Sequence, residues 1–149
     1  MSIINPLTIL LVEDNPDHVY LTLEGFKRSG MTNDIKVVTD GQEALDYLFR
    51  EGKYNDEKSY PNPDLILLDI KLPKKDGIEV LKIIKDDDGL KNIPVIMLTT
   101  SKDENEIINS YNFGANSFIS KPVVFSDFMN AIHELHLYWC ITNTLPPAH

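Results

Sequence analysis

Five short runs of apolar residues, separated by segments with helical spacing, constrain the fold of this chain most strongly. The runs lie at 9–12, 35–38, 65–68, 95–98 and 118–119. They are rich in branched side chains and are bounded by Pro, Asp, Asn or Gly, which is typical of buried strands. The first, third and fourth runs show no polar alternation. This pattern indicates strands that are covered on both faces, as in a parallel sheet.

Amphipathic segments follow the five runs and predict five helices. We expect these helices at about 16–26, 42–49, 78–84, 104–112 and 126–141. Asn15 is expected to cap the first helix, with Pro16 at its first position. Because crossovers between parallel strands are right-handed, the repeated strand–helix order predicts an α/β fold. The expected architecture is a doubly wound five-stranded parallel sheet with helices on both faces.

The segment 51–63 interrupts the regular alternation of strands and helices. It is a long polar link before the third strand, and we expect it to be a surface loop, with a partner contact as the alternative. The chain has 149 residues, and neither flank of the link is long enough to be a domain of its own. The sequence therefore predicts a single domain.

The charge balance argues against two classes of partner. Lys and Arg number 14 and Asp and Glu number 23, which gives a net charge of −9. Such a chain lacks the positive surface that binds DNA or an anionic membrane. No apolar run reaches the ~18–20 residues that span a bilayer. The lone cysteine, Cys140, forms no intramolecular disulfide, and we expect a cytoplasmic protein.

Polar side chains follow four of the expected strands. Glu13 and Asp14 follow the first strand, Asp69 the third, Thr99 the fourth and Lys121 the fifth. Doubly wound sheets bind ligands at the carboxyl ends of their strands, so we expect these groups to converge there. Each residue alone has an ordinary explanation as a helix-start, turn, strand or loop residue. Their occurrence at four strand ends together indicates a site.

The chemistry that such a group of residues supports is narrow. Three neighbouring carboxylates raise one another's pKa, and a hard divalent cation removes that conflict. Mg²⁺ prefers oxygen ligands from carboxylates, water and phosphate. A carboxylate that acts as a nucleophile can then form an aspartyl phosphate. The Lys121 ammonium and the Thr99 hydroxyl would compensate the charge on the phosphoryl oxygens.

Four segments resemble the receiver domain of two-component response regulators, the phospho-acceptor partners of histidine kinases. They are ILLVEDN at 9–15, DLILLDIKLPKKDG at 64–77, IPVIMLTTS at 93–101 and GANSFISKP at 114–122. The resemblance covers about residues 7–141 and implies a flavodoxin-like fold with strand order 2-1-3-4-5. It further implies one receiver domain over 1–149, with a tail at 142–149 and no output domain.

Three features are similar to the stand-alone response regulators of cyanobacterial phytochromes. They are the stretch Leu-Pro-Lys-Lys-Asp-Gly, the long link at 51–63, and the Tyr-Trp followed by Thr-Leu-Pro near the end of the chain. This likeness implies a sensor histidine kinase of the phytochrome type as the partner. No DNA-binding motif is present in the sequence, so we expect the output to be a contact with another protein, a further phosphorelay step or competition for the kinase.

The resemblance to receiver domains also implies a phosphorylation site and a metal site. Asp69 matches the aspartate that is phosphorylated. Glu13 and Asp14 match the acidic pair at a Mg²⁺ ion, with Asp14 as the more direct ligand. The backbone carbonyl of Lys71 matches the remaining protein ligand.

A switch is implied in the same way. Thr99 matches the hydroxyl that turns toward the phosphoryl group, and Phe118 matches the switch aromatic. Lys121 matches the family's active-site lysine, and its bond to Pro122 is expected to be cis. With Asp69, Lys121 and Thr99 in catalytic roles, the protein would catalyse its own phosphorylation and slow dephosphorylation without being a conventional enzyme.

The last expected helix carries more apolar residues than one stripe can hold. We expect an inward stripe of Phe125, Phe128, Met129, Ile132, Leu135 and Trp139. Leu137, Tyr138 and Ile141 lie off that stripe. This excess favours a homodimer through the fourth and fifth helices and the C-terminal region. The alternative is that the Pro-Pro tail folds back over these side chains.

Other functions fit the sequence less well. The main alternative is a receiver-like interaction module that works without phosphorylation. A haloacid-dehalogenase-like phosphatase would carry Asp-x-Asp after the first strand. A flavin or nucleotide binder would need a Gly- or Ser/Thr-rich loop there, whereas Glu13 and Asp14 repel phosphate. His18, in the first helix near the acidic residues, is expected to be a surface residue.

Overall fold

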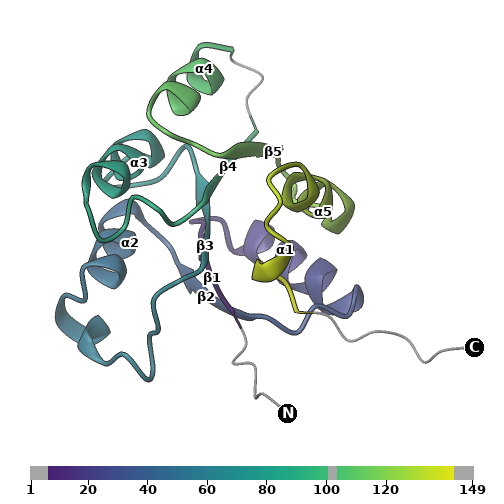
Figure 1. Ribbon diagram of the computed structural model, residues 1–149, viewed down its shortest axis with the longest axis horizontal. Coiled ribbons are helices and arrows are strands. Elements are labelled where there is room, and N and C mark those ends of the chain that lie inside the picture. The colour runs from purple at the N-terminus through teal and green to yellow at the C-terminus, as the bar shows by residue number, and fades with distance from the viewer. Residues whose placement is uncertain (1–6, 101–103, 143–149) are drawn as a thin grey trace, which may run out of the picture.

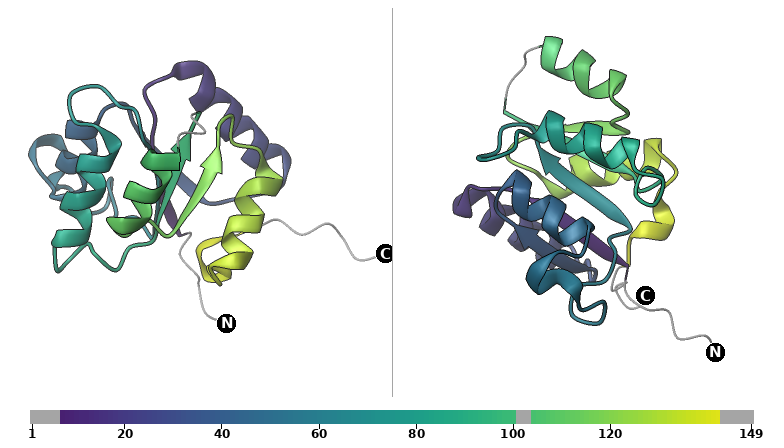
Figure 2. Two further views of the ribbon diagram at one scale, coloured as in Figure 1. Left: turned by 90° about the horizontal axis from the view of Figure 1, so that it is seen from above. Right: turned by 90° about the vertical axis from the view of Figure 1, so that its left-hand side faces the viewer.

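The computed structural model describes residues 7–100 and 104–142 as one parallel sheet between two layers of helices (Figures 1 and 2). Its elements are β1 (Thr8–Val12), α1 (Pro16–Arg28), β2 (Asp34–Val38), α2 (Gly41–Leu48), η1 (Gly52–Asn55), β3 (Leu65–Asp69), α3 (Gly77–Asp86), β4 (Val95–Thr99), α4 (Glu104–Asn112), β5 (Ser117–Ser120), α5 (Phe125–Glu134) and η2 (Tyr138–Cys140). The strand order is β2-β1-β3-β4-β5. The predicted doubly wound fold and strand order are therefore confirmed.

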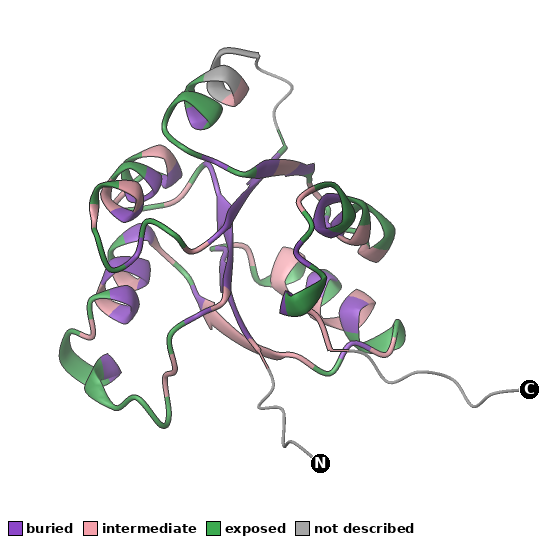
Figure 3. Ribbon diagram, viewed as in Figure 1, coloured by how far each residue is buried: buried purple, intermediate pink, exposed green. Residues whose placement is uncertain are grey.

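Two apolar cores, one on each face of the sheet, hold these layers together. Leu10 and Val12 of β1 enter the core beneath α2 and α3, whereas Ile9 and Leu11 enter the core beneath α1 and α5. Figure 3 shows the central strands as buried. Because alternate side chains fill different cores, positions 9–12, 65–68 and 95–98 of the central strands are all apolar. This arrangement explains the unalternated runs in the sequence.

The first helix begins as predicted. Asn15 has an extended backbone, and its side-chain oxygen accepts hydrogen bonds from the backbone N–H groups of Asp17 and His18. Pro16 occupies the first helical position, where the missing N–H costs nothing. The cap fixes the first turn of α1 directly after the acidic residues that end β1.

The link at 51–63 is more ordered than a polar surface loop. Tyr54, in η1, is only 6% exposed, and its ring lies 5.1 Å from that of Tyr47 and 4.8 Å from that of Tyr60. The Tyr47 hydroxyl donates to the Pro61 carbonyl over 2.8 Å, and Arg50 Nη1 donates to the Tyr60 carbonyl over 3.0 Å. The aromatic residues of this polar segment fold it back over α2.

The predicted fifth helix was too long. α5 ends at Glu134, and His136 then adopts a positive φ of 55°, before the short turn η2. The change of direction also changes which side chains face inward. Leu137 is 9% exposed and Trp139 is 55% exposed, so the inward stripe was wrong at these two positions.

The last described residue, Thr142, is hydrogen-bonded to the two residues that precede β2. Thr32 N donates to the Thr142 carbonyl over 2.8 Å, and Thr142 N donates to Asn33 Oδ1 over 2.7 Å. Beyond Thr142, the predicted tail lies outside the described residues. Within residues 7–100 and 104–142, no helix has the length and apolar character that crossing a bilayer requires.

Candidate functional site

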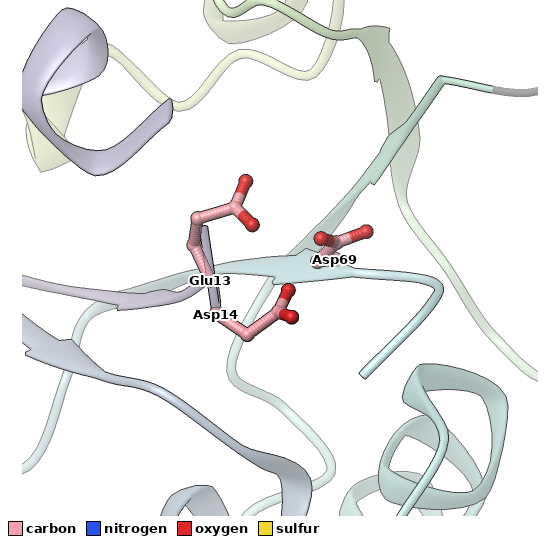
Figure 4. A group of neighbouring side chains, drawn as sticks. All are labelled: Glu13, Asp14 and Asp69. Atoms are coloured by element: carbon pink, nitrogen blue, oxygen red, sulfur yellow. The ribbon is translucent and has the colours of Figure 1, made fainter. Parts of the chain in front are cut away.

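Three carboxylates meet at the carboxyl ends of β1 and β3, as the strand-end argument predicted. Glu13 and Asp14 directly follow β1, and Asp69 is the last residue of β3. One oxygen from each of the three lies within 4.8 Å of the others, and Figure 4 shows the three side chains around a common space. Glu13 and Asp69 are 2% and 4% exposed, whereas Asp14 is exposed to solvent.

Lys121 bridges the two buried carboxylates. Its Nζ atom lies 2.6 Å from Glu13 Oε1 and 2.8 Å from Asp69 Oδ2, and the lysine side chain is 6% exposed. Two anions and one cation are thus buried together, and the ammonium satisfies one oxygen of each carboxylate. The cluster carries net negative charge, to which the exposed carboxylate of Asp14 adds.

Backbone hydrogen bonds hold these side chains in place. Asp69 Oδ1 accepts from Lys71 N over 3.2 Å, and Glu13 Oε2 accepts from Asn15 N over 3.2 Å. Lys121 N donates to the carbonyl of Thr99 over 2.8 Å, which anchors the lysine to the end of β4. The ends of four elements therefore determine the geometry of the site.

Burial raises the pKa of Asp69 to about 6, with Glu13 adding to the shift and Lys121 opposing it. Burial alone would lower the pKa of Lys121, but its hydrogen bonds to Asp69 and Glu13 outweigh this effect and raise it. The lysine therefore stays protonated at neutral pH. Because its pKa is raised, the ionised form of Asp69 is less favourable in the folded protein than in the unfolded chain.

Removing that charge should stabilise the fold. We expect Asp69→Asn to raise the free energy of unfolding by about 1–3 kcal/mol at about pH 8, without divalent cations. The pKa of Asp69 is 3.8 when unperturbed and about 6 in the fold. The stability that its protonated form contributes is therefore complete below 3.8 and is lost as the pH rises through 6. The advantage of the variant should disappear by about pH 4.

Urea-induced unfolding followed by circular dichroism at a series of pH values measures this difference. Asp88→Asn is the matched control, because the Asp88 side chain is 97% exposed and pairs only with Lys91 at the surface. The control should show no comparable gain at high pH. A wild-type protein as stable as Asp69→Asn at about pH 8 would contradict the conclusion that this charge is unfavourable.

A close backbone approach fixes the loop between β3 and α3, which carries Lys71. A Cβ atom at Gly77 would lie 2.1 Å from the carbonyl oxygen of Asp69. On the other side of the loop, a Cβ atom at Gly41 would lie 2.0 Å from the carbonyl oxygen of Lys75. Only glycine allows these contacts, so the loop is clamped between the starts of α2 and α3.

The remaining residues that the sequence singled out lie around this cluster. Thr99 ends β4 and is buried, one position beyond Leu98, which pairs with Asp69 in the sheet. Phe118 lies in β5, half-buried, with its ring 4.7 Å from that of Tyr111 in α4. The Lys121–Pro122 peptide bond is cis, the geometry that the resemblance implies.

One residue lies closer to the site than expected. His18 Nδ1 is 3.6 Å from Glu13 Oε1, although the sequence analysis assigned this histidine to the surface. A signal for its position was present, because His18 lies in the first turn of α1, directly after the acidic residues that end β1. That placement alone does not show that the ring turns inward.

The donor set fits a hard divalent cation. The three carboxylates offer oxygen ligands, which Mg²⁺ and Mn²⁺ prefer, and no sulfur ligand is near them in the described ranges. The unfavourable charge on Asp69 is the kind that a bound cation relieves. Glu13, Asp14 and Asp69 would hold the ion.

The fold and the site define a class: a doubly wound α/β protein with a lysine-bridged acidic pocket at the carboxyl ends of its strands. The family model of the response regulator receiver domain matches residues 9–133. The chain belongs to this family. The resemblance that its four segments indicated is thus confirmed.

Its relatives include response regulators of phytochromes. Rcp1 from Synechocystis sp. is 40% identical over 143 residues, which are 96% of this chain and 95% of that protein. The Mn²⁺-bound form of Rcp1 superimposes with a TM-score of 0.74 at 39% identity, covering 95% of this chain and 100% of that chain.

Two further solved structures resemble the chain closely. The bacteriophytochrome response regulator RtBRR gives a TM-score of 0.82 at 44% identity and covers 96% of this chain and 86% of that chain. The phosphorylated cyanobacterial phytochrome response regulator RcpA gives 0.77 at 41% identity, with 96% and 100% covered. The chain is thus related to phytochrome response regulators.

Proposed function

We propose that the chain is a phospho-accepting response regulator whose Asp69 receives a phosphoryl group in a Mg²⁺-dependent reaction. The observation that carries the proposal is the buried carboxylate of Asp69, with its Oδ2 atom 2.8 Å from Lys121 Nζ and two further carboxylates beside it. The phosphorylated form of RcpA and the Mn²⁺-bound form of Rcp1 support this proposal.

In the proposed reaction, an oxygen of Asp69 attacks the phosphorus of a phosphohistidine on a sensor histidine kinase. The bond from phosphorus to the imidazole nitrogen breaks, and the leaving imidazole keeps the electron pair of that bond and takes up a proton. Bound Mg²⁺ supplies compensation for the negative charge on the phosphoryl oxygens. Glu13, Asp14 and the backbone carbonyl of Lys71 are the residues that we assign to holding it, together with Asp69.

Lys121 and Thr99 act on the product in this proposal. The Lys121 ammonium turns from the carboxylates to a phosphoryl oxygen, and the Thr99 hydroxyl donates to another. The hydrogen bond from Lys121 N to the Thr99 carbonyl supports the idea that the two residues respond together. Phe118 then changes position against Tyr111, which biases α4, β5 and α5 toward another surface.

The same proposal includes the partners. The relatives among phytochrome response regulators support a sensor histidine kinase of the phytochrome type. The output is a protein contact, in keeping with a net charge of −9, which does not suit DNA. A homodimer through α4, α5 and the C-terminal region remains part of the proposal, as does the cytoplasm, where the unpaired thiol of Cys140 stays reduced.

Intact-protein mass spectrometry tests this function. The wild type, incubated with Mg²⁺ and a small phosphoryl donor such as acetyl phosphate, should gain one phosphoryl group. Asp69→Asn should gain none, and neither should the wild type with a chelator. If the wild type gains no mass with the small donor or with candidate kinases, the chain is a phosphorylation-independent interaction module instead.

A further inference from the structure

The first turn of α1 directs an imidazole nitrogen at the acidic site. His18 Nδ1 lies 3.6 Å from Glu13 Oε1, and the side chain of His18 is 29% exposed. Among the side chains that the structure describes, this nitrogen is the only buried nitrogen or oxygen that makes no hydrogen bond. A buried polar atom without a partner is unfavourable, so its position calls for an explanation.

The backbone around His18 leaves little freedom for that ring. His18 N donates to Asn15 Oδ1 over 3.3 Å, and the His18 carbonyl accepts from Thr22 Oγ1 over 2.8 Å. Asn15 N in turn donates to Glu13 Oε2 over 3.2 Å. The helix cap therefore fixes the carboxylate and the imidazole relative to each other.

Lys121 already contacts Glu13 Oε1, the oxygen that His18 faces. Its Nζ atom lies 2.6 Å from Glu13 Oε1, a full ångström closer than the imidazole. As long as the lysine stays there, Glu13 has a strong partner and His18 has none. When the ammonium turns to a phosphoryl group, the Oε1 atom of Glu13, a residue that is 2% exposed, loses the lysine as its partner, whereas Asn15 N still donates to Oε2. A buried carboxylate oxygen without a hydrogen-bond donor is unfavourable.

We propose that His18 is a positioning residue that replaces Lys121 as the partner of Glu13 when the lysine moves to the phosphoryl group. A shift of less than an ångström brings Nδ1 within hydrogen-bond distance of Oε1. The neutral imidazole donates from Nδ1, so no change of protonation is needed. The inference rests on the proposed function, because it concerns the state in which Lys121 contacts a phosphoryl group.

Beryllofluoride, which mimics a phosphoryl group on a carboxylate, provides the test. Its affinity in the presence of Mg²⁺ is measured by fluorine NMR and calorimetry at about pH 8, where an ordinary imidazole is neutral. We expect His18→Leu to weaken binding about tenfold, the effect of losing one hydrogen bond of ordinary strength. His18→Asn, whose amide nitrogen lies where Nδ1 lies, should restore most of that affinity.

Two further measurements separate this role from simple packing. Affinity for Mn²⁺ alone, followed by electron paramagnetic resonance, should change less than about twofold in His18→Leu, because Lys121 stays on Glu13 in that state. In a Lys121→Met background, His18→Leu should produce no further loss of beryllofluoride affinity. Without the lysine, His18 pairs with Glu13 in both states and no longer favours one of them.

Each contrary result overturns the inference. If His18→Leu binds beryllofluoride as tightly as the wild type, His18 does not position Glu13. If His18→Leu and His18→Asn lose the same affinity, the effect comes from side-chain packing and not from a hydrogen bond. If His18→Leu loses as much affinity for Mn²⁺ as for beryllofluoride, His18 supports only the metal site. If the loss in His18→Leu adds to that of Lys121→Met, His18 acts independently of the lysine. Failure of the wild type to bind beryllofluoride or gain a phosphoryl group would instead contradict the proposed function.

Discussion

Replacing Lys121 by methionine is expected to lower the free energy of unfolding by about 3–5 kcal/mol when no divalent cation is present. The ammonium lies 2.6 Å from Glu13 Oε1 and 2.8 Å from Asp69 Oδ2, and all three side chains are at most 6% exposed. Methionine keeps most of the apolar stem and removes the charge. The two carboxylates then face each other without a cation, and both are almost fully buried.

The loss in Lys121→Met should depend on pH and on metal. Without the ammonium, the pKa of Asp69, already raised to about 6, rises further. The folded variant then binds this proton at a higher pH than the wild type does, so the loss should shrink as the pH falls from about 8 toward about 6. Mg²⁺ should stabilise the variant more than the wild type, because the ion replaces the missing positive charge.

Urea-induced unfolding at about pH 8 and about pH 6, each with and without Mg²⁺, measures both effects. The control is Lys91→Met, which removes a lysine 3.1 Å from Asp88 Oδ1 in a pair that solvent surrounds. That variant should resemble the wild type, because exposed ion pairs contribute little. Similar losses in the two lysine variants, or a Lys121→Met protein as stable as the wild type, would contradict the prediction. Either result would show that burial does not make the contacts of Lys121 with Glu13 and Asp69 stronger than an exposed ion pair.

The central sheet could be predicted from the sequence because its strands lack polar alternation. Leu65 to Leu68 are fully buried, since alternate side chains enter opposite cores. Polar strand ends were harder to predict. Asp34 and Ser117 belong to β2 and β5, but hydropathy alone does not mark them as strand residues. Their inclusion depends on backbone pairing with Thr8 and Ile96.

The end of α5 could not be predicted, because apolar spacing continues past the point where the helix stops. His136 has a φ of 55°, a conformation that glycine or asparagine would have signalled. Once the chain turns there, helical periodicity no longer decides which side faces the core. This is why Leu137 is buried and Trp139 is exposed, the reverse of the prediction.

The link at 51–63 lies mostly at the surface, as expected, but its composition concealed a small core. Its charged and amide residues suggested a solvated loop, but the rings of Tyr47, Tyr54 and Tyr60 pack together. Burial raises the pKa of Tyr47 to about 12, with Asp34 adding to the shift. Two tyrosines placed within a polar segment were the available signal for this packing.

The residues of the site could be predicted from their places at the strand ends, but the contacts between their side chains could not. Topology brings Glu13, Asp14 and Asp69 to one edge of the sheet, which the sequence argument foresaw. The bridge that Lys121 makes depends on the direction of a long side chain, which no spacing rule specifies. The inward turn of His18 depends on the helix cap at Asn15 in the same way.

One methyl group at Gly77 should lower the free energy of unfolding by about 3 kcal/mol. In Gly77→Ala the new Cβ atom would lie 2.1 Å from the carbonyl oxygen of Asp69 and 2.7 Å from that of Ile70. Both obstacles are backbone atoms, which no side-chain rotation can move aside. The start of α3 must therefore retreat from the end of β3, and the hydrogen bond from Gly77 N to the Ile70 carbonyl, 2.8 Å long, must lengthen.

The same displacement should disturb the site, because the loop between β3 and α3 connects Asp69 to Lys71. We therefore expect weaker Mn²⁺ binding in Gly77→Ala, measured by electron paramagnetic resonance beside the unfolding experiment. Gly25→Ala in α1 is the matched control, since no atom lies within 4 Å of its new Cβ. It should gain about 0.5–1 kcal/mol from improved helix propensity. If Gly77→Ala keeps the stability and the Mn²⁺ affinity of the wild type, the close approach of α3 to Asp69 does not hold the loop in place.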